Sequence, residues 1–197
     1  MLLGVALLYF VSTNKHKFYE IKQILAKHGI TLKWHKLELK EEKNATLEKI
    51  AKSKAKQAYR KIKKPLIVED TGIFFDGLTE FPGANAKRIY EKIGYAGLLR
   101  FASMKSGKAY FKTVICFTDG KRHILFSGKL RGKITERVYC KNKDVMPYER
   151  IFVPEGFNRP LCMLSRKKKN EISHRAKAAE RLADWLKKNI EFGFKNV

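Results

Sequence analysis

Acidic residues are scarce in this chain. Its 197 residues include 19 Asp and Glu against 43 Lys and Arg, which gives a formal net charge of +24. A protein this positive attracts polyanions such as nucleotides and nucleic acid, although lysine-rich helices are also ordinary solvated surfaces. The charge alone therefore selects no partner, but it makes the group of carboxylates within residues 69–80 stand out.

Cysteine is also rare, and the three cysteines form no motif. Cys116, Cys140 and Cys162 are far apart, odd in number and not spaced as a CxxC pair. This spacing argues against a zinc site and against a disulfide framework, and it favours a reducing environment. We therefore expect a cytoplasmic protein.

Long apolar runs are absent as well. The run over residues 1–11 is too short to span a bilayer and lacks the basic start of a secretion signal. Such a run is typical of a parallel strand buried on both faces, so we expect a strand here and no membrane association. The chain also lacks GxxxxGK[ST] and GxGxxG, so neither a P-loop nor a Rossmann site is indicated.

The hydrophobic pattern alternates between strand and helix periods. Residues 12–29 and 45–64 have helical spacing, with Asn14 as a predicted N-cap and Gly29 as a predicted end of the first helix. The other predicted elements are strands over residues 31–40, 65–70, 108–139 (with a hairpin turn at the Asp-Gly of TDGK) and 149–156, and helices over residues 83–94, 95–104 and from 173 onwards. This order indicates an α/β fold with a mixed sheet flanked by helices.

Short polar side chains stand at the first junction between strand and helix. Ser12, Thr13, Asn14 and Lys17 could surround a phosphate with donors at the positive end of the helix dipole. The same residues also fit ordinary N-capping by Asn14 with a solvated Lys17. On this stretch alone, capping is the better interpretation.

A pair of acids ends the strand predicted at residues 65–70. Glu69 and Asp70 lie at its carboxyl end, where open α/β sheets bind ligands. Carboxylate oxygens suit Mg²⁺, and a carboxylate can also orient or deprotonate a water molecule. A local turn in which Asp70 caps backbone groups explains the residues equally well.

A third polar cluster precedes the last predicted helix. Lys169, His174 and Arg175 gather at a predicted helix start, which suits an anion, whereas Lys167 and Lys168 are better explained as solvated. Two clusters that suit anions and one acid pair that suits a metal together indicate a site for a triphosphate with Mg²⁺.

Four motifs occur in order between Ser12 and Arg175. STNKHK is similar to [ST]-x-N-x-x-K, and VEDTGIFFDGLTEFPG is similar to V-E-D-[ST]-G-L followed by G-x-P-G. IFVPEG is similar to I-F-x-P-E-G, and KKNEISHR is similar to E-K-N-x-[IV]-S-H-R. In sequence and spacing, the chain resembles the Ham1/RdgB/inosine triphosphatase family of nucleoside triphosphate pyrophosphatases.

The resemblance implies a single Ham1-like domain over residues 1–197. The implied fold is an elongated mixed sheet flanked by helices, with two lobes, an active-site cleft between them and a homodimeric assembly. The implied activity is Mg²⁺-dependent attack of water on ITP, XTP, dITP or dXTP, which gives the monophosphate and pyrophosphate.

The resemblance also implies roles for individual residues. Asp70 binds metal and accepts the proton of the attacking water, and Lys56 is the second catalytic residue. The other metal ligand is Glu41 or Glu42, depending on the alignment, with Glu42 preferred and Glu69 as a further candidate. The residues implied to bind substrate are Ser12, Thr13, Asn14, Lys17, Thr71, Lys87, Met146, Tyr148, Glu149, Lys169, His174 and Arg175.

The segment VMPYER departs from the family pattern G-F-G-[YW]-D-P. Met146 stands where an aromatic residue stacks on the base, Pro147 replaces a Gly and Glu149 replaces an Asp. The residues on the phosphate side are retained and those on the base side are not, so we expect weaker discrimination among bases.

The alternative function is that of a divergent, weakly active homologue that binds nucleic acid or nucleotides through its basic surface. Asp70, the Glu41/Glu42 pair and Lys56 discriminate between the two functions, because an RNA-binding protein has no reason to keep them.

Overall fold

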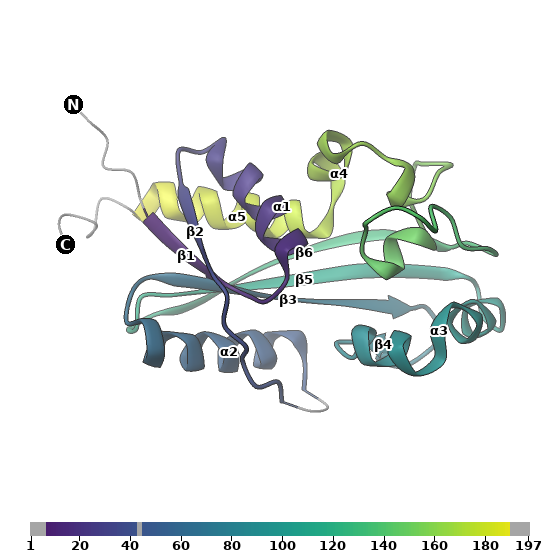
Figure 1. Ribbon diagram of the computed structural model, residues 1–197, viewed down its shortest axis with the longest axis horizontal. Coiled ribbons are helices and arrows are strands. Elements are labelled where there is room, and N and C mark those ends of the chain that lie inside the picture. The colour runs from purple at the N-terminus through teal and green to yellow at the C-terminus, as the bar shows by residue number, and fades with distance from the viewer. Residues whose placement is uncertain (1–6, 43–44, 190–197) are drawn as a thin grey trace. The chain divides into compact units, whose positions relative to one another are not determined.

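The computed structural model describes residues 7–42 and 45–189 (Figure 1). The strands are β1 (Leu7–Val11), β2 (Thr31–His35), β3 (Leu66–Phe75), β4 (Pro82–Gly83), β5 (Lys108–Thr118), β6 (His123–Ile134) and β7 (Phe152–Pro154). The helices are α1 (Lys15–Ala26), α2 (Leu47–Ile62), α3 (Ala86–Ser103), α4 (Arg166–Ile172) and α5 (His174–Asn189), with short 3₁₀ helices η1 (Pro147–Arg150) and η2 (Leu161–Met163).

The strands form one mixed sheet in the order β2-β1-β3-β5-β6-β7, with β4 paired to β3. Strand β1 is parallel to both β2 and β3, whereas the β3–β4 and β6–β7 pairs are antiparallel. The predicted α/β fold with a mixed sheet flanked by helices is therefore confirmed. Strand β1 is apolar throughout, and β3 is apolar at both ends around the polar residues Glu69, Asp70 and Thr71.

Local signals account for the ends of the helices. The Asn14 side chain accepts hydrogen bonds from the backbone N–H groups of His16 (2.9 Å) and Lys17 (3.2 Å), so the predicted N-cap is confirmed. Gly29 has a φ of 73° just after α1, which is the left-handed conformation expected where a helix stops. Gly94, at φ 59°, breaks α3 into the two helical pieces that the sequence predicts.

Three predicted elements differ from the structure, and the first is the strand expected over residues 65–70, which runs from Leu66 to Phe75. The strand expected over residues 31–40 ends at His35, because the following segment leaves the sheet and its Lys40 backbone pairs with the Gln57 side chain at 3.0 and 2.9 Å. The run RKKKNEI forms helix α4, which the sequence analysis did not predict because a basic run is also typical of a solvated loop. The first strand is confirmed over Leu7–Val11, and residues 1–6 lie outside the described part.

The chain divides into two compact units. Unit 1 comes from residues 1–70, 113–128 and 175–197, and unit 2 from residues 71–112 and 129–174. The unit boundaries fall within β3, β5, β6 and the first turn of α5, so neither unit is one continuous piece of chain. A single domain over residues 1–197 therefore stays a prediction.

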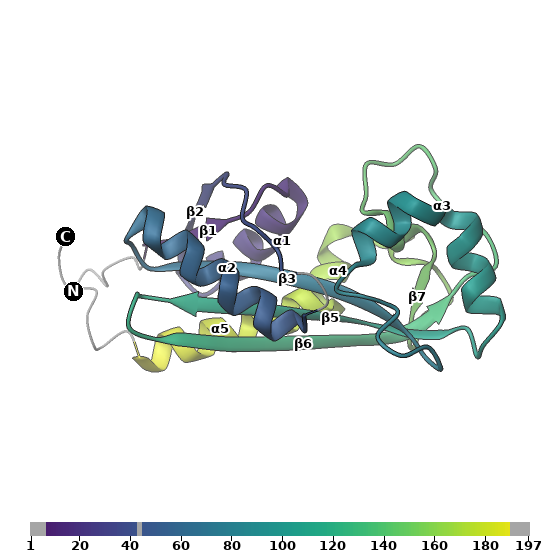
Figure 2. The ribbon, with the colours of Figure 1, turned by 90° about the horizontal axis from the view of Figure 1, so that it is seen from below.

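Each unit has its own hydrophobic core. In unit 1, Phe10, Ile67 and Phe117 of the sheet pack with apolar residues of α1 and α5. Helix α2 covers the opposite face of this part of the sheet (Figure 2). In unit 2, apolar residues of α3 pack with the end of β3, the start of β5 and residues of η1 and β7. Within the described ranges, no helix is long and apolar enough to cross a membrane.

Candidate active site

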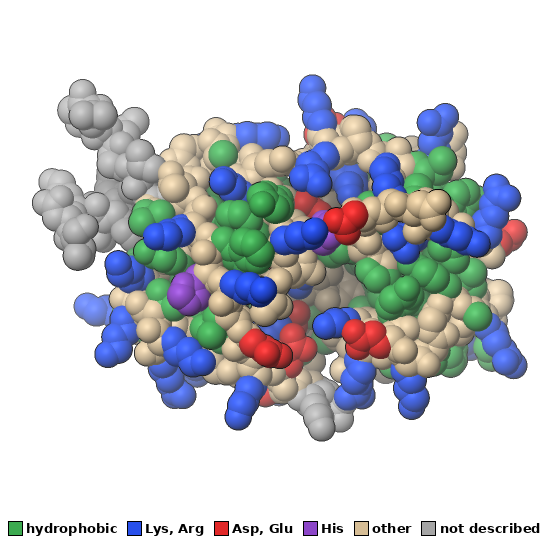
Figure 3. All heavy atoms as spheres, viewed as in Figure 1, with side chains coloured by type: hydrophobic (Ala, Val, Ile, Leu, Met, Phe, Trp, Pro, Cys, Tyr) green, Lys and Arg blue, Asp and Glu red, His purple; other side chains and the backbone are tan. Residues whose placement is uncertain are grey.

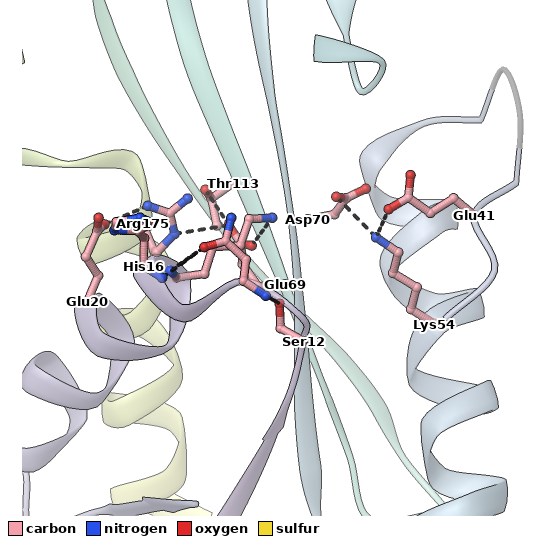
Figure 4. Close-up of polar contacts among 11 residues, drawn as sticks. Ser12, His16, Glu20, Glu41, Lys54, Glu69, Asp70, Thr113 and Arg175 are labelled. Atoms are coloured by element: carbon pink, nitrogen blue, oxygen red, sulfur yellow. Dashed lines mark hydrogen bonds and ion pairs between the residues drawn. The ribbon is translucent and has the colours of Figure 1, made fainter. Parts of the chain in front are cut away.

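The sequence prediction that Glu69 and Asp70 end a strand is wrong, because β3 continues to Phe75 and both acids lie in its middle. They are presented to opposite faces of the sheet. Successive strand residues alternate in direction, so Glu69 points toward α1 and α5 while Asp70 points toward α2 (Figure 4). Both residues are buried, with 4% of Glu69 and 6% of Asp70 exposed. The two neighbouring carboxylates therefore have separate partners and separate chemistry.

Asp70 faces a lysine and a second carboxylate. The Lys54 ammonium lies 3.4 Å from Oδ1 of Asp70 and 2.5 Å from Oε1 of Glu41 (Figure 4). The other oxygen of Asp70, Oδ2, is buried and accepts no hydrogen bond from any residue in the described part of the chain. A buried carboxylate oxygen without a donor is costly, and it fits a group that binds a cation or a water molecule.

Burial and neighbouring charges act on the pKa of both groups. For Asp70, burial raises the pKa most strongly, Lys17 and Lys54 lower it, and Glu69 and Glu41 raise it, with a net rise. For Lys54, burial lowers the pKa, but Asp70, Glu41 and Glu69 outweigh burial and the net shift is upward. Lys54 therefore stays cationic, and Asp70 holds a proton more readily than an ordinary aspartate.

The carboxylate oxygens of Asp70 and Glu41 are hard ligands of the kind that Mg²⁺ prefers. Glu41 has 60% of its side chain exposed and shares Lys54 with Asp70, so both carboxylates can reach one cation. Glu42 is exposed and has no such contact among the described residues, and the predicted choice between Glu41 and Glu42 as metal ligand stays a prediction. Within the described residues, no group of three or more side chains that could hold a metal occurs.

Glu69 belongs to a buried network of ion pairs. Its Oε2 lies 2.6 Å from the Lys17 ammonium, and its Oε1 accepts from Arg175 Nε and Thr113 Oγ1, each at 3.2 Å. Arg175 also binds Oε2 of Glu20 at 2.6 Å (Figure 4). These cations occupy Glu69, so it is a poor candidate for the metal site.

At the start of α1, most polar side chains bond to other groups of the protein. Ser12 Oγ accepts from the backbone N–H of Asn14 at 3.1 Å, and Asn14 caps the helix. Lys17 points to Glu69 rather than to solvent, and Thr13 is exposed. The capping interpretation is confirmed, and phosphate binding at this junction stays a prediction.

In unit 2, the residues of η1 and α4 that are predicted to bind substrate lie close together. Glu149 is buried and pairs with the Lys169 ammonium at 2.8 Å. The Tyr148 hydroxyl donates to the backbone carbonyl of Ala86 at 2.8 Å, and burial raises the pKa of that hydroxyl. Met146 is half-buried at the start of η1.

The remaining predicted residues are spread over unit 2. The His174 ring is 4% exposed and stacks on Phe111, with 4.6 Å between centroids and 11° between planes. Thr71 is half-buried after Asp70. Lys87 has 90% of its side chain exposed and pairs with Glu91 at 3.8 Å, so nothing in unit 2 supports a substrate contact for it.

Comparison with known proteins places this chain in a family. Residues 8–185 match the model of the Ham1 family. The chain belongs to the Ham1 family. It is 35% identical to a Thermococcus kodakarensis protein named dITP/XTP pyrophosphatase, over 93% of this chain and 99% of that relative. It is 34% identical to a Yarrowia lipolytica protein named inosine triphosphate pyrophosphatase, over 92% of this chain and 96% of that relative.

Solved structures of Ham1 proteins share the fold. A HAM1 protein from Coxiella burnetii matches with a TM-score of 0.76 and 24% identity, over 92% of this chain and 99% of its own. The Staphylococcus aureus Ham1 protein matches with a TM-score of 0.68 and 22% identity, over the same shares of the two chains.

The structure brings to Asp70 a lysine, Lys54, that the sequence analysis did not single out. Lys54 is 8% exposed and contacts Asp70, whereas Lys56, the predicted catalytic lysine, is exposed on α2. A signal for Lys54 is present in the sequence, because this lysine falls on the apolar stripe of the helix between Ile50 and Ala58. A cation on a buried stripe requires a partner, and Asp70 and Glu41 are that partner.

Proposed function

We propose that this Ham1-family chain is a nucleoside triphosphate pyrophosphatase. Its substrates would be ITP, XTP, dITP and dXTP, and its products the monophosphate and pyrophosphate. The carrying observation is the buried Asp70 carboxylate, which keeps one oxygen without a donor beside Lys54 and Glu41. The names of relatives aligned over nearly the whole chain support the same activity.

Asp70 would act on the attacking water. Burial raises the pKa of this carboxylate, so it takes a proton more readily than an exposed aspartate does. Lys54 remains charged beside it and would face the negative charge that grows on the phosphates. We therefore transfer the catalytic role predicted for Lys56 to Lys54.

Glu41 and Asp70 would hold Mg²⁺ together with phosphate oxygens of the substrate. When bound, the metal supplies neutralisation of phosphate charge and a template for the oxygens. Glu41 would reach the cation from the segment before α2, while Asp70 would reach it from β3. We propose Glu41 in place of Glu42 because it alone of the two pairs with Lys54.

The other predicted residues divide between the two ends of the substrate. Ser12, Thr13, Asn14 and Lys17 would contact phosphates, with Lys17 held in place by Glu69. The residues proposed for the base and sugar are Thr71, Met146, Tyr148, Glu149, Lys169, His174 and Arg175. Lys87 is left out because its side chain is almost fully exposed.

Product analysis with a panel of triphosphates tests this function. With Mg²⁺ present, ITP and XTP should give monophosphate and pyrophosphate, ATP should react more slowly, and EDTA should stop the reaction. Orthophosphate and a diphosphate as products would contradict the proposal, because they report cleavage between the β and γ phosphates.

We also propose that the protein acts as a cytoplasmic homodimer. The family resemblance supports the homodimer. The three free cysteines support a reducing compartment such as the cytoplasm. Light scattering during size-exclusion chromatography measures the assembly, and a mass near 22.9 kDa would contradict the dimer.

A further inference from the structure

Arg150 joins the end of η1 to the loop that precedes this helix. Its guanidinium donates through Nη2 to the backbone carbonyl of Lys143 at 2.7 Å. Its own backbone carbonyl accepts from the N–H of Tyr139 at 3.1 Å. All three residues belong to unit 2. Arg150 therefore closes residues 139–150 into one hydrogen-bonded segment.

Tyrosines of α3 attach this segment to the rest of unit 2. The Tyr95 hydroxyl donates to the backbone carbonyl of Pro147 at 3.2 Å and accepts from Arg150 Nη1 at 3.4 Å. The Tyr90 ring packs against the rings of Tyr95 and Tyr148, with 4.9 and 6.3 Å between centroids. The Arg150 side chain thus binds both the loop before η1 and the helix that supports η1.

The contacts of Arg150 leave one of its donors unsatisfied. The side chain is half-buried, and its Nε is buried without a hydrogen-bond partner in the described part of the chain. A buried donor without a partner is destabilising, and this cost offsets the gain from the bonds of Nη1 and Nη2. Arg150 therefore orders the segment while adding little to the free energy of unfolding.

The sequence pattern shows which residue type Arg150 replaces. The family pattern G-F-G-[YW]-D-P ends in Pro, whereas VMPYER ends in Arg150. A proline restricts the backbone through its ring, and Arg150 restricts it through hydrogen bonds to two other segments. The proline of VMPYER stands earlier, at Pro147 in the first turn of η1, where a missing N–H costs nothing.

We propose that Arg150 is a positioning residue for recognition of the base. It acts through the segment that carries Met146 and Glu149, which the proposed function assigns to the base, so this inference rests on that function. Without the guanidinium the segment has several conformations, of which only a fraction binds the base, and the apparent affinity falls by that fraction. The reaction at Asp70 should continue unchanged once substrate is bound, because Asp70 lies in unit 1.

Arg150→Met removes the guanidinium and keeps most of the side chain. We expect KM for ITP to rise by about threefold or more and kcat to stay within about twofold of wild type. Competitive inhibition by inorganic triphosphate, which has no base, should be unchanged, and thermal unfolding should shift little. Arg159→Met is the matched control, because Arg159 is an exposed arginine of unit 2, and its KM should equal that of wild type.

Two results of these measurements would overturn the proposal. One is an unchanged KM for Arg150→Met. The other is an equal weakening of inhibition by inorganic triphosphate, because it would mean that Arg150 attracts phosphates by its charge.

Further variants separate geometry from charge. Arg150→Lys keeps the charge, but a single ammonium does not span the Lys143 carbonyl and the Tyr95 hydroxyl, so KM should rise as in Arg150→Met. Tyr95→Phe should also raise KM, and its combination with Arg150→Met should have less than the product of the two single effects. A wild-type KM for Arg150→Lys, or fully multiplicative effects in the double variant, would contradict the positioning role.

Hydrogen exchange tests the ordering of the segment without the reaction. Peptides that cover residues 139–150 should exchange faster in Arg150→Met than in wild type, while peptides of α1 in unit 1 should not change. Equal exchange over residues 139–150 would overturn the proposal. If wild type does not hydrolyse ITP although the difference in exchange is present, the proposed function is wrong and the ordering of the segment by Arg150 stands.

Discussion

At the scale of single residues, opposing influences act on the Asp70 carboxylate. Burial raises its pKa, while the ammonium groups of Lys17 and Lys54 lower it. The balance leaves a carboxylate that stays close to two cations yet binds a proton more tightly than an exposed aspartate. A group with these properties can both hold a divalent cation and take a proton from water.

Replacing Asp70 by Asn should abolish turnover and keep the fold. The amide has nearly the same shape but neither binds Mg²⁺ well nor accepts a proton, so we expect kcat for ITP to fall by about 100-fold or more. The free energy of unfolding should change little, because ionised Asp70 is itself penalised by burial. Initial rates and thermal unfolding measure the two effects. Retention of more than about a tenth of the activity would contradict the assigned role.

The pH profile should report the same residue. Only ionised Asp70 can accept a proton, so kcat/KM should fall as the pH drops through its pKa. Because the pKa is raised above the ordinary value of 3.8, the midpoint of the acid limb should lie above pH 3.8. Rates measured with ITP from about pH 4 to pH 8 test this. A midpoint at or below the ordinary value would show that another group controls the acid limb.

Glu41 and Glu42 form a matched pair for the metal site. Glu41→Gln should raise the Mg²⁺ concentration required for half-maximal activity by about tenfold, because one charged oxygen ligand is lost. Glu42→Gln, on an exposed side chain, should leave it unchanged. Titration of activity with Mg²⁺ measures the requirement of each variant. A larger rise for Glu42→Gln than for Glu41→Gln would assign the metal to Glu42 instead.

At the scale of elements, the geometry of helix α2 places Lys54 in a buried environment and Lys56, two positions later, in solvent. A step of two residues rotates a side chain by roughly 200° around a helix, so Lys54 and Lys56 point in nearly opposite directions. Lys54 reaches Asp70, and Lys56 stays in solvent. Strand β3 does the same with Glu69 and Asp70, which face opposite sides of the sheet.

Lys54→Gln and Lys56→Gln should therefore behave differently. The first variant removes a buried cation from two carboxylates, so we expect kcat for ITP to fall by about 10-fold to 100-fold. The second should remain within about twofold of wild type, because an exposed lysine makes little specific contribution. Steady-state kinetics on both variants, with circular dichroism to check folding, decides between the two lysines. Equal losses would contradict the placement of Lys54 at the site.

At the scale of the whole molecule, the sequence carries a net charge of +24. Lys and Arg side chains project from all parts of the visible face, with few acids among them (Figure 3). A distribution of this kind attracts polyanions without arranging donors for particular bases. It also raises the local concentration of any triphosphate.

We expect weak, non-specific binding to nucleic acid. Affinity for a duplex or a single strand should fall steeply between low and physiological salt, because released counterions drive the association. Fluorescence anisotropy at several salt concentrations measures this slope. A submicromolar, sequence-selective complex at physiological salt would instead support the alternative function through the basic surface.

The sequence by itself determined the fold class, the N-cap at Asn14, the break at Gly94 and the family. These features depend on local periodicity, on the conformational freedom of single residues and on short motifs in a fixed order. Only the tertiary structure showed that Lys54 contacts Asp70 and Glu41 while Lys56 is exposed, and that Glu69 lies in a buried network with Lys17 and Arg175. Those contacts depend on which way a side chain points and on which distant segment it meets. A one-residue shift in register reverses that direction without changing any motif.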